Sequence, residues 1–244
     1  MTAPSTPSMP VGAKLAVANG AWNFDGPVMA AGFVDHVRRS VPFYDAGHGL
    51  AAELASTFVR PGGLGYEFGT STGQLLRTLA TSAERNRAAS WIGVERVPEM
   101  VESARRHCAG LGNVSVVKAD LTDFELRPCD FAVAYLTLNF LDEKPRADVL
   151  ARVRQSLREG GGLFVFEKVL TPDPHLAAII DLLHLRFKRA NGLSPEEILN
   201  KADSLAGILQ PATAEEYVDL MRAAGFRRVT SVMRYLCFEG FLAQ

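Results

Sequence analysis

The sequence predicts an α/β protein built on a mostly parallel β-sheet with helices on both faces. Three observations predict this fold class. Short apolar runs rich in valine, isoleucine and aromatic residues recur along the chain, segments with helical spacing separate most of them, and two β-like runs follow the last helical segment. Such alternation is typical of parallel sheets, because each parallel strand needs a crossover connection. For 244 residues, 48% of them hydrophobic, we expect one domain.

The strands are expected where the apolar runs are short and rich in β-branched and aromatic residues. They occupy residues 65–68, 91–95, 114–117, 131–136 and 163–166, and the two late runs lie within 227–243. Crossover helices are expected at 73–80, 98–109 and 145–157, and three glycines at 160–162 are expected to end the last of them. The prediction is a seven-stranded sheet that a late hairpin closes.

The remaining segments predict how the domain is bounded and covered. Residues 1–13, mostly Pro, Ser, Thr and Ala, are expected to form a flexible tail, so that the single domain spans 14–244. Helical spacing at 28–39 and 49–59 predicts two lid-like helices ahead of the sheet. A helical insertion at about 172–212 precedes the last helix, and we expect it to roof the active site.

Composition and charge exclude several classes of partner. The formal net charge is −1 and the basic residues are scattered, which disfavours nucleic acid. No apolar stretch reaches the ~18 to 20 residues of a membrane span, and no signal segment is visible. Three widely spaced cysteines indicate buried thiols in a reducing compartment, so we expect a cytoplasmic protein. The five histidines lack metal-ligand spacing, so no metal is expected.

A glycine-bearing turn, Tyr-Glu-Phe-Gly-Thr-Ser-Thr-Gly at 66–73, joins the first expected strand to the next helix. Gly69 and Gly73 permit a sharp turn and close approach of the backbone to a ligand. We expect the amides at the start of the following helix to be free to donate, and Thr70 and Ser71 to be among the residues that bind the ligand. The same turn can serve packing alone in a doubly wound fold, so by itself it leaves binding and packing open.

Polar residues follow the next two expected strands. Glu95 and Arg96 follow the second strand, where an acidic side chain can bind the two hydroxyls of an adenine-linked ribose. Asp120 and Leu121 follow the third, where a carboxylate and a backbone amide can bind an adenine. For Glu95 and Asp120 taken one at a time, the simpler explanation is a solvated carboxylate at the end of a strand. Together with the turn they favour one shared adenosyl ligand, and the missing G-x-G-x-x-G spacing disfavours a dinucleotide.

Several further motifs closely resemble the carboxy-S-adenosylmethionine synthase family. They are Trp-Asn-Phe-Asp at 22–25, Arg-Ser-Val-Pro at 39–42 with Tyr44, Arg-Arg-His at 105–107, Glu-Lys at 167–168 and, most specific, Phe-Lys-Arg-Ala-Asn-Gly at 187–192. The similarity runs from about residue 22 to the C-terminus. It implies the Rossmann-like class I methyltransferase fold, S-adenosylmethionine (SAM) as cofactor or cosubstrate, and a homodimer. Cofactor contacts would carry over onto Tyr44, Gly69, Glu95, Arg96, Asp120 and Leu121.

Two positions depart from the family pattern. The family binds its extra carboxylate with an arginine that follows a lysine in the helical insertion, whereas Lys201 is followed here by Ala202. It also has an asparagine where this chain has Tyr135. An alanine cannot replace a guanidinium that binds a carboxylate through two hydrogen bonds. We therefore expect SAM binding without the carboxylation of SAM, which uses prephenate in that family.

The chemistry that remains favours SAM as its own substrate. Its amine would attack its own γ-carbon, release methylthioadenosine and close azetidine-2-carboxylate, and azetidine-2-carboxylate synthases resemble a branch of this fold. Asn139 is the expected acceptor for the amine. Tyr135 and Tyr44 are expected to present π faces to the sulfonium. Trp22 and Phe24 are candidates for the same role, although packing of the lid explains them better.

Other assignments stay open. His184 and Arg186 could serve as base and carboxylate partner, but a core-satisfied or solvated side chain explains each better. The alternative functions are a methyltransferase acting on a small natural product, carboxy-SAM synthesis itself, and a catalytically silent SAM-binding module that regulates a partner. Each of the enzymatic functions implies a small-molecule substrate.

Overall fold

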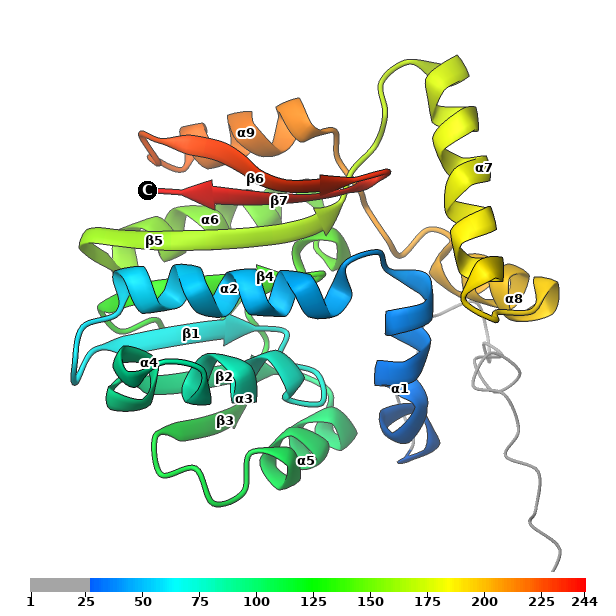
Figure 1. Cartoon of the computed structure of the whole chain (residues 1–244). Helices are drawn as coiled ribbons and strands as arrows, with labels where there is room; N and C mark the ends of the chain where they lie inside the picture. The colour runs from blue at the N-terminus through cyan, green and yellow to red at the C-terminus, as the bar shows by residue number, and fades with distance from the viewer. Residues whose placement is uncertain (1–26) are drawn as a thin grey trace, which may run out of the picture.

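The computed structural model describes residues 27–244, so the predicted tail at 1–13 and the candidates Trp22 and Phe24 lie outside the described part of the chain. At its centre is a seven-stranded sheet of order β3-β2-β1-β4-β5-β7-β6 (Figure 1). The strands are β1 Leu64–Phe68, β2 Ser90–Glu95, β3 Val114–Lys118, β4 Cys129–Tyr135, β5 Leu157–Lys168, β6 Val229–Tyr235 and β7 Phe238–Ala243. Strands β1 to β5 are parallel to one another, and β7 runs antiparallel to β5 and β6. The predicted seven-stranded, mostly parallel sheet is confirmed.

Helices cover both faces of this sheet. They are α1 Pro27–Ser40, α2 Tyr44–Phe58, α3 Gln74–Thr81, α4 Glu84–Ala88, α5 Pro98–His107, α6 Glu143–Ser156, α7 Pro174–Ala190, α8 Pro195–Leu205 and α9 Ala214–Ala223. Figure 1 shows α2 in front of the sheet, with α6 and α9 behind it. Two differences from the expected helices stand out: α2 begins earlier than predicted, and the short α4 was not predicted.

The core consists of two apolar clusters, one on each face of the sheet. Leu75, Leu76 and Leu79 of α3 pack in one cluster, whereas Val149 and Tyr217, from α6 and α9, pack in the other. Strand β4 contributes to both, because successive side chains of a strand point to opposite faces. Its residues Phe131, Val133 and Tyr135 join the α2 side, and Ala132 and Ala134 join the other side. This alternation sets Tyr135 facing α2.

The three glycines at 160–162 lie inside β5, so the prediction that they end the preceding helix is wrong. Helix α6 ends at Ser156, and Leu157 already pairs with Cys129 of β4. The register of the β4–β5 pair then shifts before Phe131, and Gly160 has a φ of 77°. A glycine at positive φ permits such an irregularity within a paired strand. The glycine run therefore bends a strand instead of ending a helix.

Helices α7 and α8 occupy the predicted insertion at 172–212. Asp173 caps α7 by accepting a hydrogen bond from the Leu176 amide, and Ser194 with Glu197 forms a capping box at the start of α8. Helix α7 stands out from the body in Figure 1. It carries aliphatic side chains that are at least 40% exposed: Leu176, Ile179, Leu182, Leu183 and Leu185. The homodimer expected from the sequence stays a prediction.

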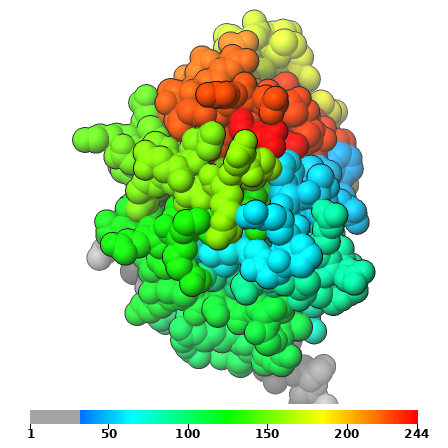
Figure 2. Space-filling model, turned by 90° about the vertical axis from the view of Figure 1, so that its left-hand side faces the viewer, coloured from blue at the N-terminus to red at the C-terminus, as the bar shows by residue number. Residues whose placement is uncertain are grey.

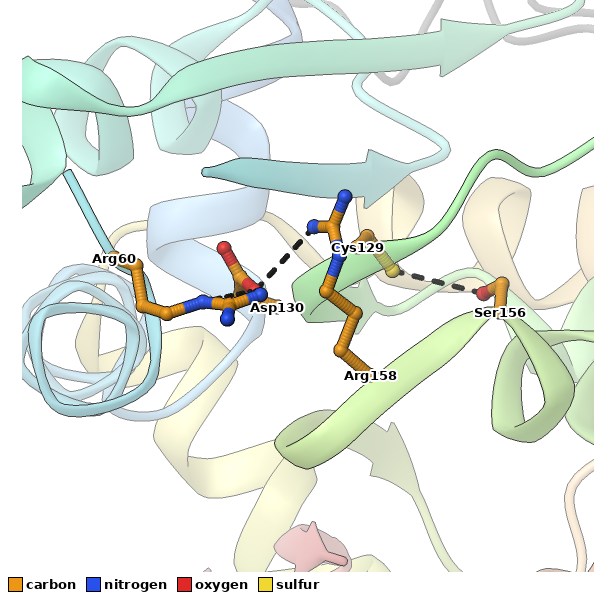
Figure 3. A network of polar contacts seen from close by, with 5 residues as sticks. All are labelled: Arg60, Cys129, Asp130, Ser156 and Arg158. Atoms are coloured by element: carbon orange, nitrogen blue, oxygen red, sulfur yellow. Dashed lines mark hydrogen bonds and ion pairs between the residues drawn. The ribbon is translucent and has the colours of Figure 1, made fainter. Parts of the chain in front are cut away.

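The parallel strands begin at the end of the sheet that lies away from α7 and α8. Figure 2 looks at this end, where segments from the early (cyan), middle (green) and final (red) parts of the chain lie side by side. Here the Arg60 guanidinium donates to Asp130 Oδ1 at 2.7 Å, and Arg158 Nη1 lies 3.4 Å from the same oxygen (Figure 3). The Cys129 thiol lies 3.6 Å from the Ser156 hydroxyl. The side chain of Asp130 is only 3% exposed, so two arginines balance one buried carboxylate.

Within residues 27–244, no helix combines the length and the apolar character that crossing a membrane requires.

Candidate functional site

A cavity of about 300 Å³ opens at the carboxyl ends of the parallel strands, where helices α1, α2, α7 and α8 enclose it. In open α/β sheets, this edge is where ligands bind. The structure places every predicted site residue on the wall of this one cavity: Tyr44, Gly69, Thr70, Ser71, Glu95, Arg96, Asp120, Leu121, Tyr135 and Asn139. The predicted juxtaposition is therefore observed, and the individual roles stay predictions.

The glycine-bearing turn follows β1 directly and leads into α3. Gly69 has a φ of 66°, and a Cβ there would collide with the side chain of Thr137. The amides of Gly69 and Thr70 donate to the Val94 carbonyl at 2.8 and 3.2 Å, and the Ser71 amide donates to Glu95 at 2.8 Å. The neighbouring strand uses these three amides to fix the turn, and donation to a ligand by the amides at the start of α3 stays a prediction. The turn offers a close approach of its backbone.

The carboxylate of Glu95 is held in one orientation at the end of β2. Its Oε1 accepts from the amides of Arg96 and Val97 at 2.9 and 3.0 Å, and its Oε2 accepts from Ser71. A carboxylate has about four acceptor positions and these three amides use three of them, so one position on Oε2 remains for a ribose hydroxyl. This fixed acceptor fits the predicted ribose contact.

Asp120 forms the neighbouring acidic position. Its Oδ1 accepts from the amide and the hydroxyl of Thr122 at 2.9 and 2.7 Å, and its Oδ2 lies 4.0 Å from Arg96 Nη1. Burial acts to raise the pKa of Asp120, but the Thr122 hydrogen bonds and the Arg96 charge together lower it. Asp120 is therefore ionised at neutral pH and presents an acceptor to the cavity.

Tyr44, His48 and Tyr135 form an aromatic wall further along the cavity. The ring centroid of His48 lies 4.3 Å from that of Tyr44 and 4.9 Å from that of Tyr135. The Tyr135 hydroxyl donates to the Tyr44 carbonyl at 3.0 Å, so this tyrosine presents its ring rather than its hydroxyl. Burial lowers the pKa of His48 to about 4 and raises that of each tyrosine. The wall is therefore uncharged at neutral pH, as a cation–π contact requires.

Two buried carboxyl groups that sequence reasoning did not select also line the cavity. Glu67 is 3% exposed and accepts a hydrogen bond from the Thr70 hydroxyl. Glu167 is fully buried, and its Oε1 accepts from the amides of Thr137 and Leu138 at 2.7 and 2.6 Å. Its Oε2 accepts no hydrogen bond from any residue between 27 and 244. Burial raises the pKa of each glutamate to about 8, so both hold a proton at neutral pH.

Asn139 is held from both ends of its amide. Its Nδ2 donates to the Lys168 carbonyl at 2.8 Å, and its Oδ1 accepts from the Tyr217 hydroxyl at 2.5 Å. Its side chain is fixed in the wall, and accepting from a substrate amine would use the second lone pair of Oδ1. The predicted acceptor role of Asn139 stays a prediction.

Three positions on the insertion have different surroundings. His184 Nε2 donates to the Ser40 carbonyl at 2.8 Å, and burial lowers its pKa to about 4, which makes it a neutral core histidine at the cavity wall. Arg186 and Ala202 are exposed and do not line the cavity. In the part of the chain from 27 onward, no three His, Cys, Asp or Glu side chains gather in a way that could hold a metal ion.

Comparison with known proteins identifies relatives that cover most of the chain. A family model described as "Methyltransferase domain" matches residues 66–161. The carboxy-S-adenosyl-L-methionine synthase of Staphylococcus epidermidis is 30% identical over 222 residues, which cover 91% of this chain and 96% of that protein. The enzyme of the same name from Pseudomonas putida is 32% identical over 218 residues, with coverages of 86% and 88%.

Solved structures share the fold at lower identity. Human N-acetylserotonin methyltransferase in complex with SAM aligns with a TM-score of 0.62 at 18% identity over 91% of this chain. An O-methyltransferase family protein from Burkholderia thailandensis aligns with a TM-score of 0.63 at 17% identity over 89%. The chain spans 57% and 59% of these two longer proteins. The predicted class I methyltransferase fold is confirmed.

Proposed function

The chain belongs to the carboxy-S-adenosyl-L-methionine synthase family of SAM-dependent enzymes, and from this premise we propose that it cyclises SAM to azetidine-2-carboxylate with release of methylthioadenosine. The site fits SAM as the substrate. Glu95 and Asp120 would hold the adenosyl group, the turn at Gly69 would lie along the methionine part, and the aromatic wall of Tyr44, His48 and Tyr135 would face the sulfonium.

The reaction needs one proton to leave before the ring closes. The amine nitrogen bonds to the γ-carbon as the bond between that carbon and sulfur breaks, and the bonding electron pair leaves with sulfur as methylthioadenosine. One proton is released overall, from the ammonium group. The protein must therefore take up this proton, hold the sulfonium and align the nitrogen with the γ-carbon.

The observation that carries the proposal is a protonatable carboxyl group beside an uncharged aromatic wall. Glu67 lies next to the turn through its bond with Thr70, and it is close enough to Tyr44 that its ionised form raises the pKa of that phenol. The Glu67 pKa of about 8 means that about a tenth of this group is ionised at pH 7, and this carboxylate is the form that accepts the ammonium proton. Because an α-amino group in water has a pKa of ~7.7 to 8.0, the transfer is nearly balanced. Each aromatic face contributes about 0.5 to 2 kcal/mol to the free energy of binding a cation such as the sulfonium. The carboxyl group and the aromatic wall thus meet two of the three demands of the cyclisation, uptake of the proton and binding of the sulfonium.

A second candidate is carboxy-SAM synthesis, which the names of the two relatives favour. Against it stands Ala202 at the position of the family's carboxylate-binding arginine, exposed and away from the cavity wall. Methyl transfer to a small molecule is the third possibility.

Incubation of the purified protein with SAM alone separates these functions. The cyclisation predicts methylthioadenosine and a cyclic amino acid in equal amounts, with one proton released for each turnover. SAM that stays intact until a small acceptor is added would indicate methyl transfer. Consumption of prephenate together with SAM would indicate carboxy-SAM synthesis and overturn the proposal.

The glutamate variant Glu67→Gln tests the proton acceptor. We expect turnover of SAM alone to fall by at least about 100-fold, within the usual range for loss of a general base, while the Kd for SAM changes less than about threefold. Glu143→Gln on the exposed face of α6 is the matched control and should change neither quantity. Equal losses in turnover and binding would assign Glu67 to binding instead.

A further inference from the structure

Three lysines gather at the end of the cavity that the insertion covers. Lys168 lies at the end of β5, Lys188 on α7 and Lys201 on α8, and all three line the cavity wall. Figure 1 shows α7 and α8 on the side of the molecule toward which the parallel strands point. Elements far apart in the sequence thus bring three lysine side chains to one place.

These lysines are partly withdrawn from water, and each acts on its neighbours. All three are half-buried. Burial and the charge of Lys168 lower the pKa of Lys188, and burial with the charge of Lys188 lowers that of Lys201 well below its usual range. No carboxylate between residues 27 and 244 lies within ion-pair distance of Lys168 or Lys188. Half-buried cations that repel one another are stabilised when an anion binds between them.

The structure explains how the sequence motif at 187–192 contributes to the cavity. It is the most family-specific stretch of the chain, yet Lys188 is its only member that lines the cavity. Phe187 packs toward His184 and Tyr235, and the Asn191 side chain donates to the Phe187 carbonyl at the end of α7. The motif therefore ends α7 in a way that directs one ammonium group into the cavity.

We propose that Lys168, Lys188 and Lys201 form a carboxylate-binding subsite at the covered end of the cavity. The opposite end carries the acidic Glu95 and Asp120, so the cavity suits a ligand with hydroxyls at one end and a carboxylate at the other. The positive charge of the subsite does not depend on position 202, which does not line the cavity. This inference rests on the proposed function, in which SAM is the ligand. The carboxylate that binds between the lysines is either that of SAM itself or that of a separate acid.

Binding measurements on the intact chain test the subsite without any turnover. The probes are SAM, decarboxylated SAM and methylthioadenosine, compared between the unchanged protein and Lys188→Gln. If the carboxylate is that of SAM, Lys188→Gln raises the Kd of SAM by about 10- to 100-fold, as expected for the loss of a hydrogen bond between charged groups. The Kd values of the two probes without a carboxylate change less than twofold.

If the carboxylate belongs to a separate acid, the Kd of SAM is unchanged by Lys188→Gln. Succinate added to protein that is saturated with methylthioadenosine then binds the unchanged protein at least tenfold more tightly than the variant. Lys188→Arg should restore affinity in either case because it keeps the charge, and Lys144→Gln on exposed α6 should have no effect.

Two results would overturn the inference: no effect of Lys188→Gln on SAM or on succinate, or equal weakening of all three adenosyl probes, which would indicate a merely structural role. Failure to bind SAM at all contradicts the proposed function instead. Tight SAM binding, with the Kd values of SAM and succinate unchanged by Lys188→Gln, contradicts only the proposed subsite.

Discussion

Buried carboxyl groups occur at both ends of the sheet, and their surroundings differ. At the start of the strands, Asp130 is approached by Arg60 and Arg158 (Figure 3). At the carboxyl ends, Glu67 and Glu167 have only a hydroxyl and backbone amides as hydrogen-bond partners, among the described residues. The fold balances the charge of the first group and leaves the other two protonated.

The difference separates a structural carboxylate from functional ones. A buried charge that the fold itself neutralises ties elements together, here the loop after α2 with β4 and β5. A buried carboxyl group without a cation has a raised pKa and can exchange a proton with a ligand or accept a cation from it. Carboxyl groups with this property are candidates for a catalytic or binding role, and Glu67 and Glu167 are two such groups at the cavity wall.

The largest expected effect at a fixed pH is on the arginine-balanced end. Replacing both Arg60 and Arg158 with Ala leaves Asp130 buried and without a cation, and we expect the free energy of unfolding to fall by about 3 kcal/mol. This is the lower end of the range for an unpaired buried charge, because both arginines are more than a third exposed and water can partly replace them. Urea unfolding measures the loss. Adding Asp130→Asn should recover much of it, whereas no recovery would mean that the charge is unimportant.

The second effect is a pH dependence that belongs to the cavity end. Folded Glu167 keeps its proton up to about pH 8, whereas an unfolded glutamate loses it near 4.5. Its stabilising effect is complete below pH 4.5 and is lost as the pH rises to 8, by up to about 1.4 kcal/mol per pH unit. Glu167→Gln should reduce this slope in urea unfolding curves recorded between pH 5 and 8. An unchanged slope would show that Glu167 is ionised throughout.

The third effect concerns ligand affinity. Asp120→Ala removes an acceptor from the cavity wall, and we expect the Kd for SAM to rise by about tenfold, as for one lost hydrogen bond to a charged group. Isothermal titration with SAM measures it. Asp120→Asn keeps the Thr122 contacts and serves as the control for the loop. If both variants bind SAM like the unchanged protein, Asp120 does not contact the ligand.

The smallest effect distinguishes the two possible roles of Asn139. Tyr217→Phe removes the hydrogen bond to Asn139 Oδ1, which we expect to cost about 1 kcal/mol of stability with little change in turnover. Asn139→Ala should slow turnover by more than it weakens SAM binding, if its amide also orients the substrate amine. Thermal unfolding and steady-state rates measure both variants. Similar losses of turnover in the two would assign Asn139 to the support of the wall alone.

The order of strands and crossover helices could be predicted from the sequence, because buried parallel strands are continuous apolar runs and their helices have a clear period. The glycines at 160–162 led to the wrong prediction of a helix end, because glycine is common both at helix ends and at irregularities within strands. The short α4 was missed because its five residues carry no apolar period.

The site could be predicted where function depends on strand ends, as for Glu95 and Asp120, because parallel topology alone brings such positions together. Glu67 and Glu167 were present in the recognised motifs, but their burial, and hence their raised pKa values, depends on packing that no local pattern contains. The three lysines come from three elements, and only the placement of α7 and α8 over the strand ends reveals that they share a cavity.

The hydrogen bond from Tyr135 to the Tyr44 carbonyl has a consequence for the speed of ligand exchange. It fastens the start of α2 to the end of β4, so this side of the cavity is fixed. On the other side, the insertion is joined to α1 by a bond from His184 to Ser40. We expect a ligand that fills the cavity to leave past this second wall, because the first is fixed. We therefore expect dissociation rates to depend on how tightly α7 holds α1, and to be insensitive to the chemistry at the sulfonium.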